Sequence, residues 1–338
     1  MREDIKDIPV YVSPKSDIID LATNENYYGY DLKILNNEFD SAINELNMFK
    51  YGPDFHQELI TAYGKYLNVD KNLILPGPGS ESIIKIIIDA LSDKNVLLLD
   101  QDFYRYEEFV KTCKREKITI ETNENMYDNI IEKANKDDVE LMFISNPNNP
   151  LGYLHKEENL LKILDNVKAY VVIDEAYFEY SNTTMIKYLD KYDNLIILKT
   201  LSKAWGLAGL RVGFAIANKK IKDYLYAVQG PFSVSVASAT IAAKVLEHPE
   251  IMAKMVSKTI QQREKLMTYL KQYSFLEVLE SYTNFIYVKY DKAKELQAKL
   301  LDSKILVNSF SSNGLRITVG SEAHVNQLIE VLDKILVG

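Results

Sequence analysis

The sequence predicts an α/β fold, in which a large, doubly wound and mostly parallel sheet domain precedes a smaller α+β domain. Two patterns carry this prediction. Short apolar runs alternate with helical stretches through most of the 338 residues. After about residue 220, a long helical stretch leads into several strands and a closing helix. We therefore expect an N-terminal arm over residues 1–30, a large domain over 31–222 and a small domain over 223–338.

The strands of the large domain are predicted from apolar, β-branched runs bounded by charged or turn-forming residues. Residues 57–67 and 81–91 are typical of the helical stretches that separate most of these runs. Such alternation predicts parallel strands with helices on both faces of the sheet. The predicted strands are residues 72–75, 95–99, 118–121, 141–144, 170–173, 195–198 and 212–216.

In the small domain, residues 234–273 are predicted as one long helical stretch and residues 322–336 as the closing helix. Strands that are grouped rather than interleaved with helices are typical of an α+β arrangement. The predicted strands are near residues 276–279, 285–288, 305–307 and 315–319.

Residues 200–213 contain one amine, two hydroxyls and one guanidinium among small residues. Glycine and alanine beside Lys203 leave room for the amine to reach a buried carbonyl. Thr200 and Ser202 before it, and Arg211 after it, can hold a phosphate nearby. This combination indicates a Schiff-base site that uses pyridoxal phosphate (PLP). The alternative is an ordinary surface lysine with an arginine that forms a salt bridge.

An acidic residue follows the predicted strand 169–173. Because ligands of open α/β sheets bind at the carboxyl ends of the strands, Asp174 is expected at the crevice. A carboxylate there can keep the pyridine nitrogen of PLP protonated, and Tyr177 can donate to the phenolic oxygen of the ring. The alternative for Asp174 is a helix cap.

Two turns follow other predicted strands. The two Asn-Pro pairs in residues 145–152 predict a rigid turn that aims Asn149 at a ligand oxygen, or else a plain turn. The glycine-rich turn at Gly79 precedes a helix whose N-terminal amides can bind an anion, although Ser80 can equally be a simple N-cap. The turn matches neither a Walker P-loop nor a GxGxxG dinucleotide fingerprint.

Taken in order, these segments resemble the fold-type I, class I/II PLP-dependent aminotransferases, and among them the histidinol-phosphate aminotransferases. Leu151 stands where the family's N-P-N-N-P-T-G pattern has threonine, and Tyr27 replaces the proline of N-E-N-P-Y-G. The similarity runs from about residue 20 to the end of the chain. The matching segments are residues 24–29, 51–54, 146–152, 174–177, 199–213, 281–285 and 314–320.

The resemblance implies the cofactor PLP and a role for each matching residue. Lys203 corresponds to the Schiff-base lysine, which also moves the proton between the substrate carbon and the cofactor. Asp174 corresponds to the ligand of the ring nitrogen, and Tyr177 and Asn149 to the ligands of the phenolate oxygen. The implied phosphate ligands are Gly79, Ser80, Glu81, Thr200, Ser202 and Arg211.

Two aromatic roles are also implied by the resemblance. Phe103 fits the side chain that stacks on the PLP ring, with Tyr106 as the alternative. Tyr51 corresponds to a tyrosine that crosses a homodimer interface to the phosphate in the partner subunit.

The substrate site implied by the resemblance is lined by Arg316, which pairs with a carboxylate or another anion. Tyr28 lies at its mouth, and Asn149 also faces it. Asn308 stands where histidinol-phosphate enzymes have a second arginine, and an amide there weakens anion binding. We expect ping-pong transfer of an amino group between glutamate and a small, phosphorylated keto compound. The alternative is a decarboxylase of a phosphorylated amino acid, similar to threonine-phosphate decarboxylases.

Composition restricts the possible partners. The 40 Lys and Arg against 48 Asp and Glu give a formal net charge of −8, which argues against nucleic acid. The single cysteine, Cys113, excludes an intramolecular disulfide, and four scattered histidines lack the spacing of metal ligands. No apolar run follows the charged N-terminus, so we expect no signal peptide, no membrane span and a cytoplasmic location.

Two other classes of protein are disfavoured. A non-catalytic binding module with this fold would carry a basic DNA-binding extension, for which the acidic chain has no room. A nicotinamide dehydrogenase would require the missing glycine fingerprint and would leave Lys203 without a role.

Overall fold

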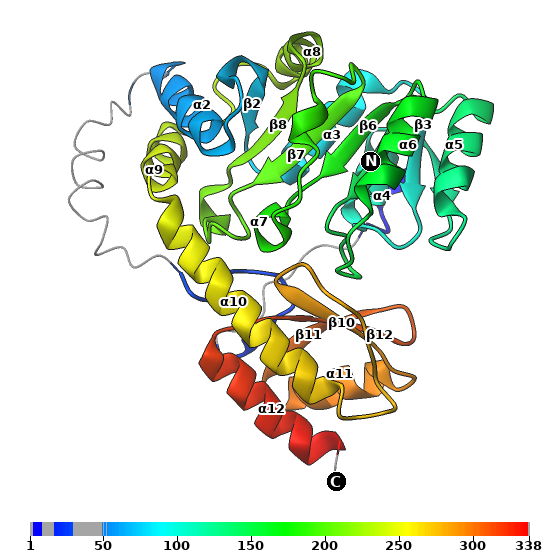
Figure 1. Ribbon diagram of the computed structural model, residues 1–338, viewed down its shortest axis with the longest axis vertical. Coiled ribbons are helices and arrows are strands. Elements are labelled where there is room, and N and C mark those ends of the chain that lie inside the picture. The colour runs from blue at the N-terminus through cyan, green and yellow to red at the C-terminus, as the bar shows by residue number, and fades with distance from the viewer. Residues whose placement is uncertain (1–2, 9–16, 30–48, 50, 52, 337–338) are drawn as a thin grey trace.

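The computed structural model describes residues 3–8, 17–29, 49, 51 and 53–336. Figure 1 shows a larger upper body built on one sheet and a smaller lower body built on a second sheet, with helix α10 running from one to the other. The predicted α/β fold class, with a large doubly wound sheet and a smaller C-terminal α+β part, is confirmed.

The large sheet has seven strands in the order β2-β8-β7-β6-β5-β3-β4. The pairs among β3 to β7 are parallel, whereas β8 is antiparallel to both of its neighbours. The central strands are buried throughout, as their uninterrupted apolar runs predict. The strands are β2 (Ile74–Gly77), β3 (Asn95–Leu99), β4 (Glu116–Ile120), β5 (Leu141–Ser145), β6 (Tyr170–Asp174), β7 (Leu195–Thr200) and β8 (Gly213–Ala217).

Helices cover both faces of this sheet. The core on one face is formed with α2, α5, α6 and α9, and the core on the other face with α3, α4 and α8. The helices are α2 (Pro53–Leu67), α3 (Ser80–Leu91), α4 (Arg105–Thr112), α5 (Met126–Lys136), α6 (Glu157–Asn166), α7 (Phe178–Ser181), α8 (Lys219–Gln229) and α9 (Val236–Leu246). Short 3-10 turns are η1 (Glu3–Ile5), η2 (Lys71–Leu73), η3 (Ile186–Tyr188) and η4 (Ala208–Leu210).

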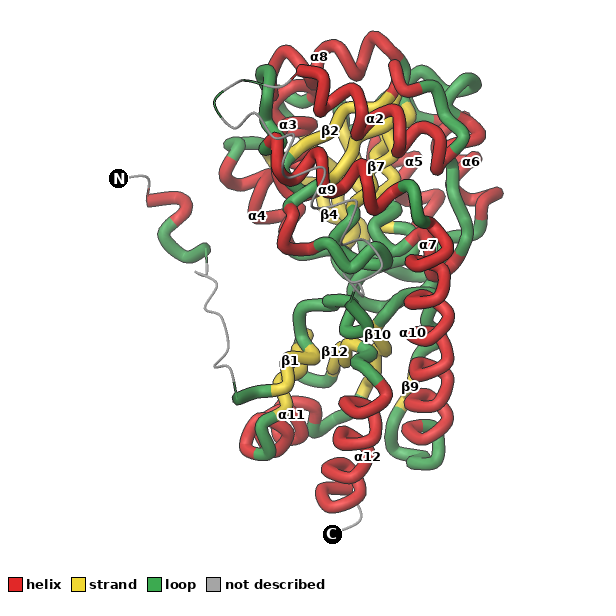
Figure 2. Tube along the Cα trace, turned by 90° about the vertical axis from the view of Figure 1, so that its left-hand side faces the viewer, coloured by secondary structure: helices red, strands yellow, loops and turns green. Residues whose placement is uncertain are grey.

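The small sheet has five strands in the order β1-β11-β12-β10-β9. Its edge strand β1 comes from the N-terminal segment and pairs in parallel with β11, with Ile19 opposite Ile305. Figure 2 shows α10 and α12 alongside this sheet, and their apolar faces share one core with it. The elements are β1 (Ile19–Leu21), α10 (Pro249–Leu270), β9 (Glu277–Val278), β10 (Phe285–Lys289), α11 (Ala293–Asp302), β11 (Ile305–Phe310), β12 (Gly314–Thr318) and α12 (Glu322–Leu336).

The prediction of one helical stretch over residues 234–273 is wrong, because two helices occupy it. Pro249 is at the first turn of α10, where its missing N–H is tolerated, and it cannot continue α9 because it cannot donate a helical hydrogen bond. α8 and α9 pack on the large-sheet side, against α3 and α2 respectively. The division into residues 1–30, 31–222 and 223–338 stays a prediction. Within the described residues, no helix is both long and apolar enough to span a membrane.

Candidate active site

A cavity of about 1140 Å³ opens at the carboxyl ends of β5, β6 and β7. Ser145, Asp174 and Thr200, the last residues of these three strands, line it. Side chains from β11 and β12 of the small sheet, including Asn308 and Arg316, line it as well. The position agrees with the rule that open parallel sheets bind ligands beyond the carboxyl ends of their strands.

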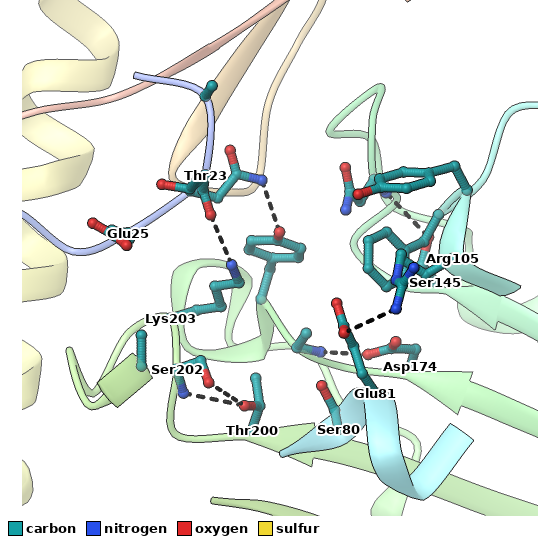
Figure 3. A pocket seen from close by; sticks show the side chains of 18 of the residues that line it. Thr23, Glu25, Ser80, Glu81, Arg105, Ser145, Asp174, Thr200, Ser202 and Lys203 are labelled. Carbon is teal, nitrogen blue, oxygen red and sulfur yellow. Dashed lines mark hydrogen bonds and ion pairs between the residues drawn. The ribbon is translucent and has the colours of Figure 1, made fainter. Parts of the chain in front are cut away.

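Lys203 lies in the turn after β7 and points into this cavity (Figure 3). Its ammonium donates to the carbonyl oxygen of Thr23 at 3.1 Å. Burial, with the nearby positive charge of Arg316, lowers the pKa of Lys203 to about 8. A much larger fraction of this amine is therefore neutral near physiological pH than for a lysine in solvent.

Asp174 ends β6 and is almost completely buried. One carboxylate oxygen accepts from the hydroxyl of Tyr106 at 2.7 Å and the other from the backbone N–H of Ala176 at 3.0 Å. Burial raises the pKa of Asp174 to about 6. Helix α7 is preceded by Tyr177 at its N-cap position, so Asp174 does not cap this helix.

Tyr177 and Asn149 are both buried at the edge of the cavity. The phenolic oxygen of Tyr177 accepts from the side-chain amide of Asn24 at 2.8 Å, and burial raises the pKa of Tyr177 to about 12. The amide oxygen of Asn149 accepts from Arg316 at 2.6 Å. The structure therefore brings the phenol of Tyr177, the amide of Asn149 and the amine of Lys203 into one cavity.

Ser80, Thr200, Ser202 and Arg211 also line the cavity, and we call these four residues the polar cradle. The Thr200 hydroxyl lies 3.0 Å from that of Ser202. Gly79 has φ +84°, and a Cβ on it would lie 2.7 Å from a terminal nitrogen of Arg211. The chain therefore approaches the guanidinium closely, and the positive φ favours glycine at this position.

A methyl group at Gly213 should damage this cradle, because an added Cβ would lie 2.5 Å from the backbone nitrogen of Ser80. We expect Gly213→Ala to lower the free energy of unfolding by about 1–3 kcal/mol, as overpacking does in a rigid setting. Denaturant unfolding measures the change. Gly209→Ala is the matched control, because its Cβ would meet nothing within 4 Å. Equal stabilities of the two variants would contradict the prediction.

The aromatic pair predicted for ring stacking occupies two different positions. Phe103 lines the cavity with its ring edge-on to Tyr106, at a centroid distance of 5.4 Å. Tyr106 also lines the cavity, and its hydroxyl donates to Asp174 from a buried position. Phe103 stays the predicted stacking residue, with Tyr106 as the alternative, and Tyr106 makes a hydrogen bond that the sequence did not indicate.

Glu81 does not direct its side chain to the cradle. Its carboxylate lies 3.6 Å from a terminal nitrogen of Arg105 (Figure 3). The guanidinium of Arg105 also pairs with Glu108. Only the backbone of Glu81 is therefore available to an anion at the start of α3.

Asp102 is a further buried carboxylic acid that sequence reasoning missed. It accepts from the backbone N–H of Phe103 at 2.7 Å and from both the N–H and the hydroxyl of Ser145. Burial raises the pKa of Asp102 to about 7. Ser145 in turn accepts from the N–H of Asn149 at 3.0 Å, so Asp102 joins the loops that carry Phe103 and Asn149. A single acid in a loop carries no sequence signal for such a role.

The N-terminal segment also supplies cavity residues that were not singled out. The side-chain nitrogen of Asn308 and one terminal nitrogen of Arg316 both donate to the carbonyl oxygen of Ala22, at 2.8 and 2.6 Å. Thr23, Asn24 and their neighbours continue along the wall. The family pattern at residues 24–29 was the available signal, but its contacts are not visible in sequence. The other lining residues that sequence reasoning missed are Asp20, Ala22, Glu25, Tyr104, Arg105, Glu108, Ala176, Ala208 and Leu306.

Three predicted site residues, Gly79, Tyr51 and Tyr28, are not among the residues that line the cavity. Tyr51 is 80% exposed, and its ring stacks on Phe232 with centroids 5.0 Å apart. Tyr28 is half-buried, with the ammonium of Lys258 5.5 Å from its ring centroid. No group of three His, Cys, Asp or Glu side chains that could hold a metal ion occurs in the described part of the chain.

Comparison with known proteins places this geometry in a family. Residues 16–332 match the family described as aminotransferase class I and II. The chain is 35% identical to the histidinol-phosphate aminotransferase of Clostridium novyi (strain NT), over 98% of this chain and 95% of that protein. It is 33% identical to the same enzyme of Caldanaerobacter subterraneus subsp. tengcongensis, over 99% of this chain and 98% of that protein.

Solved structures share the fold at lower identity. The histidinol-phosphate aminotransferase of Sinorhizobium meliloti, solved with pyridoxal-5'-phosphate, has a TM-score of 0.89 and 20% identity, covering 99% of this chain and 98% of that chain. L-threonine-O-3-phosphate decarboxylase of Porphyromonas gingivalis has a TM-score of 0.81 and 24% identity, covering 95% and 100%. These likenesses concern the fold alone. By the family match over residues 16–332 and its similarity to curated relatives along almost its whole length, the chain belongs to the aminotransferase class I and II family.

Proposed function

We propose that this protein is a PLP-dependent aminotransferase, similar to histidinol-phosphate aminotransferases, that exchanges an amino group between glutamate and a small, phosphorylated keto compound. One observation carries the proposal. The amine of Lys203, with its lowered pKa, shares a cavity with the buried carboxylate of Asp174, the phenol of Tyr177 and a polar cradle that ends at Arg211.

The residues of the cavity fit PLP group by group. Lys203 would hold its aldehyde carbon, Asp174 its ring nitrogen, and Tyr177 and Asn149 its phenolic oxygen. The cradle offers hydroxyls, a guanidinium and a helix N-terminus to the phosphate. When bound, PLP supplies an electron sink that stabilises negative charge on the substrate carbon. The residues proposed for the phosphate are Gly79, Ser80, Glu81 through its backbone, Thr200, Ser202 and Arg211.

The protein supplies charge and proton transfer around this group. Above its pKa of about 6, Asp174 is ionised and can stabilise a positive charge on a ring nitrogen. Nζ of Lys203 can take the proton from the substrate α-carbon and return it, and a pKa of about 8 suits a base that works near neutral pH.

Arg316 is the proposed ligand of a substrate carboxylate. Its two terminal nitrogens are engaged by Asn149 and by the backbone of Ala22. Its Nε is buried and has no hydrogen-bond partner among the described residues. Because Nε is not exposed to the cavity, a substrate carboxylate would have to accept from the two terminal nitrogens.

Loading of PLP should depend on the protonation of Lys203. Only the neutral amine attacks an aldehyde, and burial lowers the pKa of this lysine to about 8. We therefore expect the loading rate of the cofactor-free protein to rise about tenfold per pH unit below pH 8 and to level above it. Stopped-flow absorbance at fixed PLP concentration measures this rate. A rate that keeps rising beyond pH 10 would show an ordinary lysine.

The amide of Asn308 should limit affinity for phosphorylated substrates. Its side chain lines the cavity and donates to a backbone carbonyl, and it carries no charge. We expect Asn308→Arg to lower KM for a phosphorylated keto substrate about tenfold, because a charge-assisted hydrogen bond contributes roughly 1.5–3 kcal/mol. The unphosphorylated analogue is the control, and an equal fall in its KM would refute the role of charge.

The direct test of the proposed function is a panel of keto substrates with glutamate and the PLP-loaded protein. Imidazole-acetol phosphate and other phosphorylated ketones should react, with formation of 2-oxoglutarate. Equal, negligible rates for all of them would overturn the proposal. Release of CO2 from a phosphorylated amino acid would instead support the decarboxylase, the alternative for this fold.

We also propose a cytoplasmic homodimer in which Tyr51 reaches the phosphate of the partner subunit. High exposure of Tyr51 outside its own cavity supports this, because a phenol that served its own subunit would line the cavity. Light scattering should give twice the chain mass of 38.8 kDa. We also propose that Tyr28 lies at the mouth of the substrate site.

A further inference from the structure

We propose that Asn24 is a positioning residue which, held by Thr318, fixes the direction of the phenolic hydrogen of Tyr177, so that Tyr177 is a donor toward the cavity. The inference rests on the proposed PLP site and deepens it. Two residues that are not direct ligands of the cofactor, Asn24 and Thr318, would determine which partner donates in one hydrogen bond.

Asn24 is 1% exposed and has φ +56°, a left-handed conformation that asparagine tolerates better than most residues. Its backbone N–H donates to the hydroxyl oxygen of Thr318 at 3.1 Å. That hydroxyl donates back to the side-chain oxygen of Asn24 at 2.9 Å. The side-chain nitrogen of Asn24 then donates to the phenolic oxygen of Tyr177 at 2.8 Å. These bonds form a chain from β12 to the cavity.

Thr318 determines which way the amide of Asn24 points. If the amide were turned over, the Thr318 oxygen would face two N–H donors from Asn24, and its own hydrogen would lose its acceptor. Thr318 is completely buried, and no other acceptor for its hydroxyl is found among the described residues. An unpaired buried hydroxyl is costly, so the orientation with nitrogen toward Tyr177 is strongly favoured.

The consequence for Tyr177 follows from the inventory of a phenol, which has one hydrogen and oxygen lone pairs. Because Asn24 donates to the oxygen, the hydrogen of Tyr177 must be donated elsewhere. Tyr177 lines the cavity, and its hydroxyl makes no other hydrogen bond with the described side chains. The hydrogen is therefore available to a ligand oxygen in the cavity. The charged groups around this phenol are Asp174, Arg316 and Lys203.

The same strand carries the proposed substrate ligand. Thr318 and Arg316 are two residues apart on β12 and so lie on one face of the strand. Both contact the segment of residues 22–24. The small sheet thus holds both the guanidinium and the start of the hydrogen-bond chain to Tyr177.

Asn24→Asp tests the proposal, because a carboxylate cannot donate and would instead accept the hydrogen of Tyr177. The readout is the pH midpoint of the visible band of the PLP-loaded protein, which reports proton binding at the nitrogen joining Lys203 to PLP. Losing a donor to the phenolic oxygen should raise this midpoint by about one pH unit or more, as it should in Tyr177→Phe. An unchanged midpoint in Asn24→Asp would overturn the proposal.

The double variant Asn24→Asp/Tyr177→Phe separates the hydrogen-bond chain from a charge acting through space. If the chain operates, its midpoint should equal that of Tyr177→Phe alone. If the two shifts add, the new carboxylate acts directly on the cofactor and the proposal fails.

A second pair of variants introduces no charge. Thr318→Val removes the hydroxyl that orients the amide and should raise the midpoint, whereas Thr318→Ser keeps that hydroxyl and should restore the wild-type value. Equal midpoints in Val and Ser would overturn the proposal, even where Asn24→Asp fails to fold. A wild-type protein that gives no visible band with PLP would instead refute the proposed function itself.

Discussion

Replacing Lys203 by alanine should abolish amino-group transfer and the covalent attachment of PLP to the protein, which borohydride reduction followed by peptide mapping detects. The substitution removes the only lysine among the cavity residues, and with it both the nucleophile and the proposed proton carrier. General base catalysis alone contributes about 10²–10⁴-fold, so we expect a loss of at least about 10⁴-fold in kcat. Single-turnover absorbance with glutamate measures it. Lys299→Ala, at an exposed pair with Glu295, is the control and should retain full activity.

Although Lys203→Ala should abolish activity, it should not lower the stability of the cofactor-free protein. Burial lowers the pKa of Lys203 from 10.5 to about 8, so the folded protein binds fewer protons than the unfolded chain between these values. The unfavourable contribution is complete below about pH 8 and disappears as pH rises toward 10.5. The cofactor-free variant should therefore unfold at no lower temperature than the wild type at pH 7. A large loss of stability would attribute the inactivity to unfolding, and a borohydride-reduced PLP adduct on another lysine would move the attachment site to that residue.

Among the substitutions proposed here, Lys199→Met should cause the largest loss in the free energy of unfolding. Its side chain is 1% exposed and its ammonium lies 2.7 Å from the completely buried carboxylate of Glu175. The same ammonium lies 3.5 Å from the centroid of the Phe178 ring. The carboxylate also accepts from the hydroxyl of Thr184 at 2.6 Å and from the N–H of Met185 at 2.7 Å. Removing the cation leaves a buried charge whose remaining partners are neutral.

We expect Lys199→Met to lower the free energy of unfolding by about 3–5 kcal/mol, the usual cost of breaking a buried pair. Denaturant unfolding measures it. The double variant Lys199→Met/Glu175→Gln should recover most of the loss, because no uncompensated charge remains. Lys219→Met removes an exposed pair with Asp223 and should change stability by less than about 1 kcal/mol. A loss as small in Lys199→Met would show that the buried pair contributes little.

The strands of the large sheet were predictable because their signal is local. A parallel strand with helices on both faces needs a continuous apolar run, and β5, β6 and β7 each have one. The acid at the end of β6 follows from that run, because the carboxyl ends of parallel strands meet at one edge. Lys203 and Arg211 were predictable for a related reason, since both lie in the single connection between β7 and β8.

Strand β1 was not predicted, because three residues at a sheet edge carry no periodic signal, and its partner β11 lies almost 300 residues away in the chain. The hydrogen bond from Tyr106 to Asp174 was not predicted either. The sequence suggested ring stacking for Tyr106 and a ring-nitrogen contact for Asp174, and it gave no sign that the two side chains meet. The sequence likewise placed Glu81 at the anion site, but its side chain turns to Arg105 once α3 and α4 are packed together.

The fold class and the chemical groups of the site could be read from the sequence. The pattern of apolar residues and the identity of the residues at strand ends are properties of short, continuous segments. The tertiary structure alone decided how these groups act on one another. The pKa values of Lys203 and Asp174 depend on burial, and the bond from Asn24 to Tyr177 joins residues 153 positions apart. Desolvation and hydrogen-bond direction arise only when distant segments exclude water together, and no local pattern encodes them.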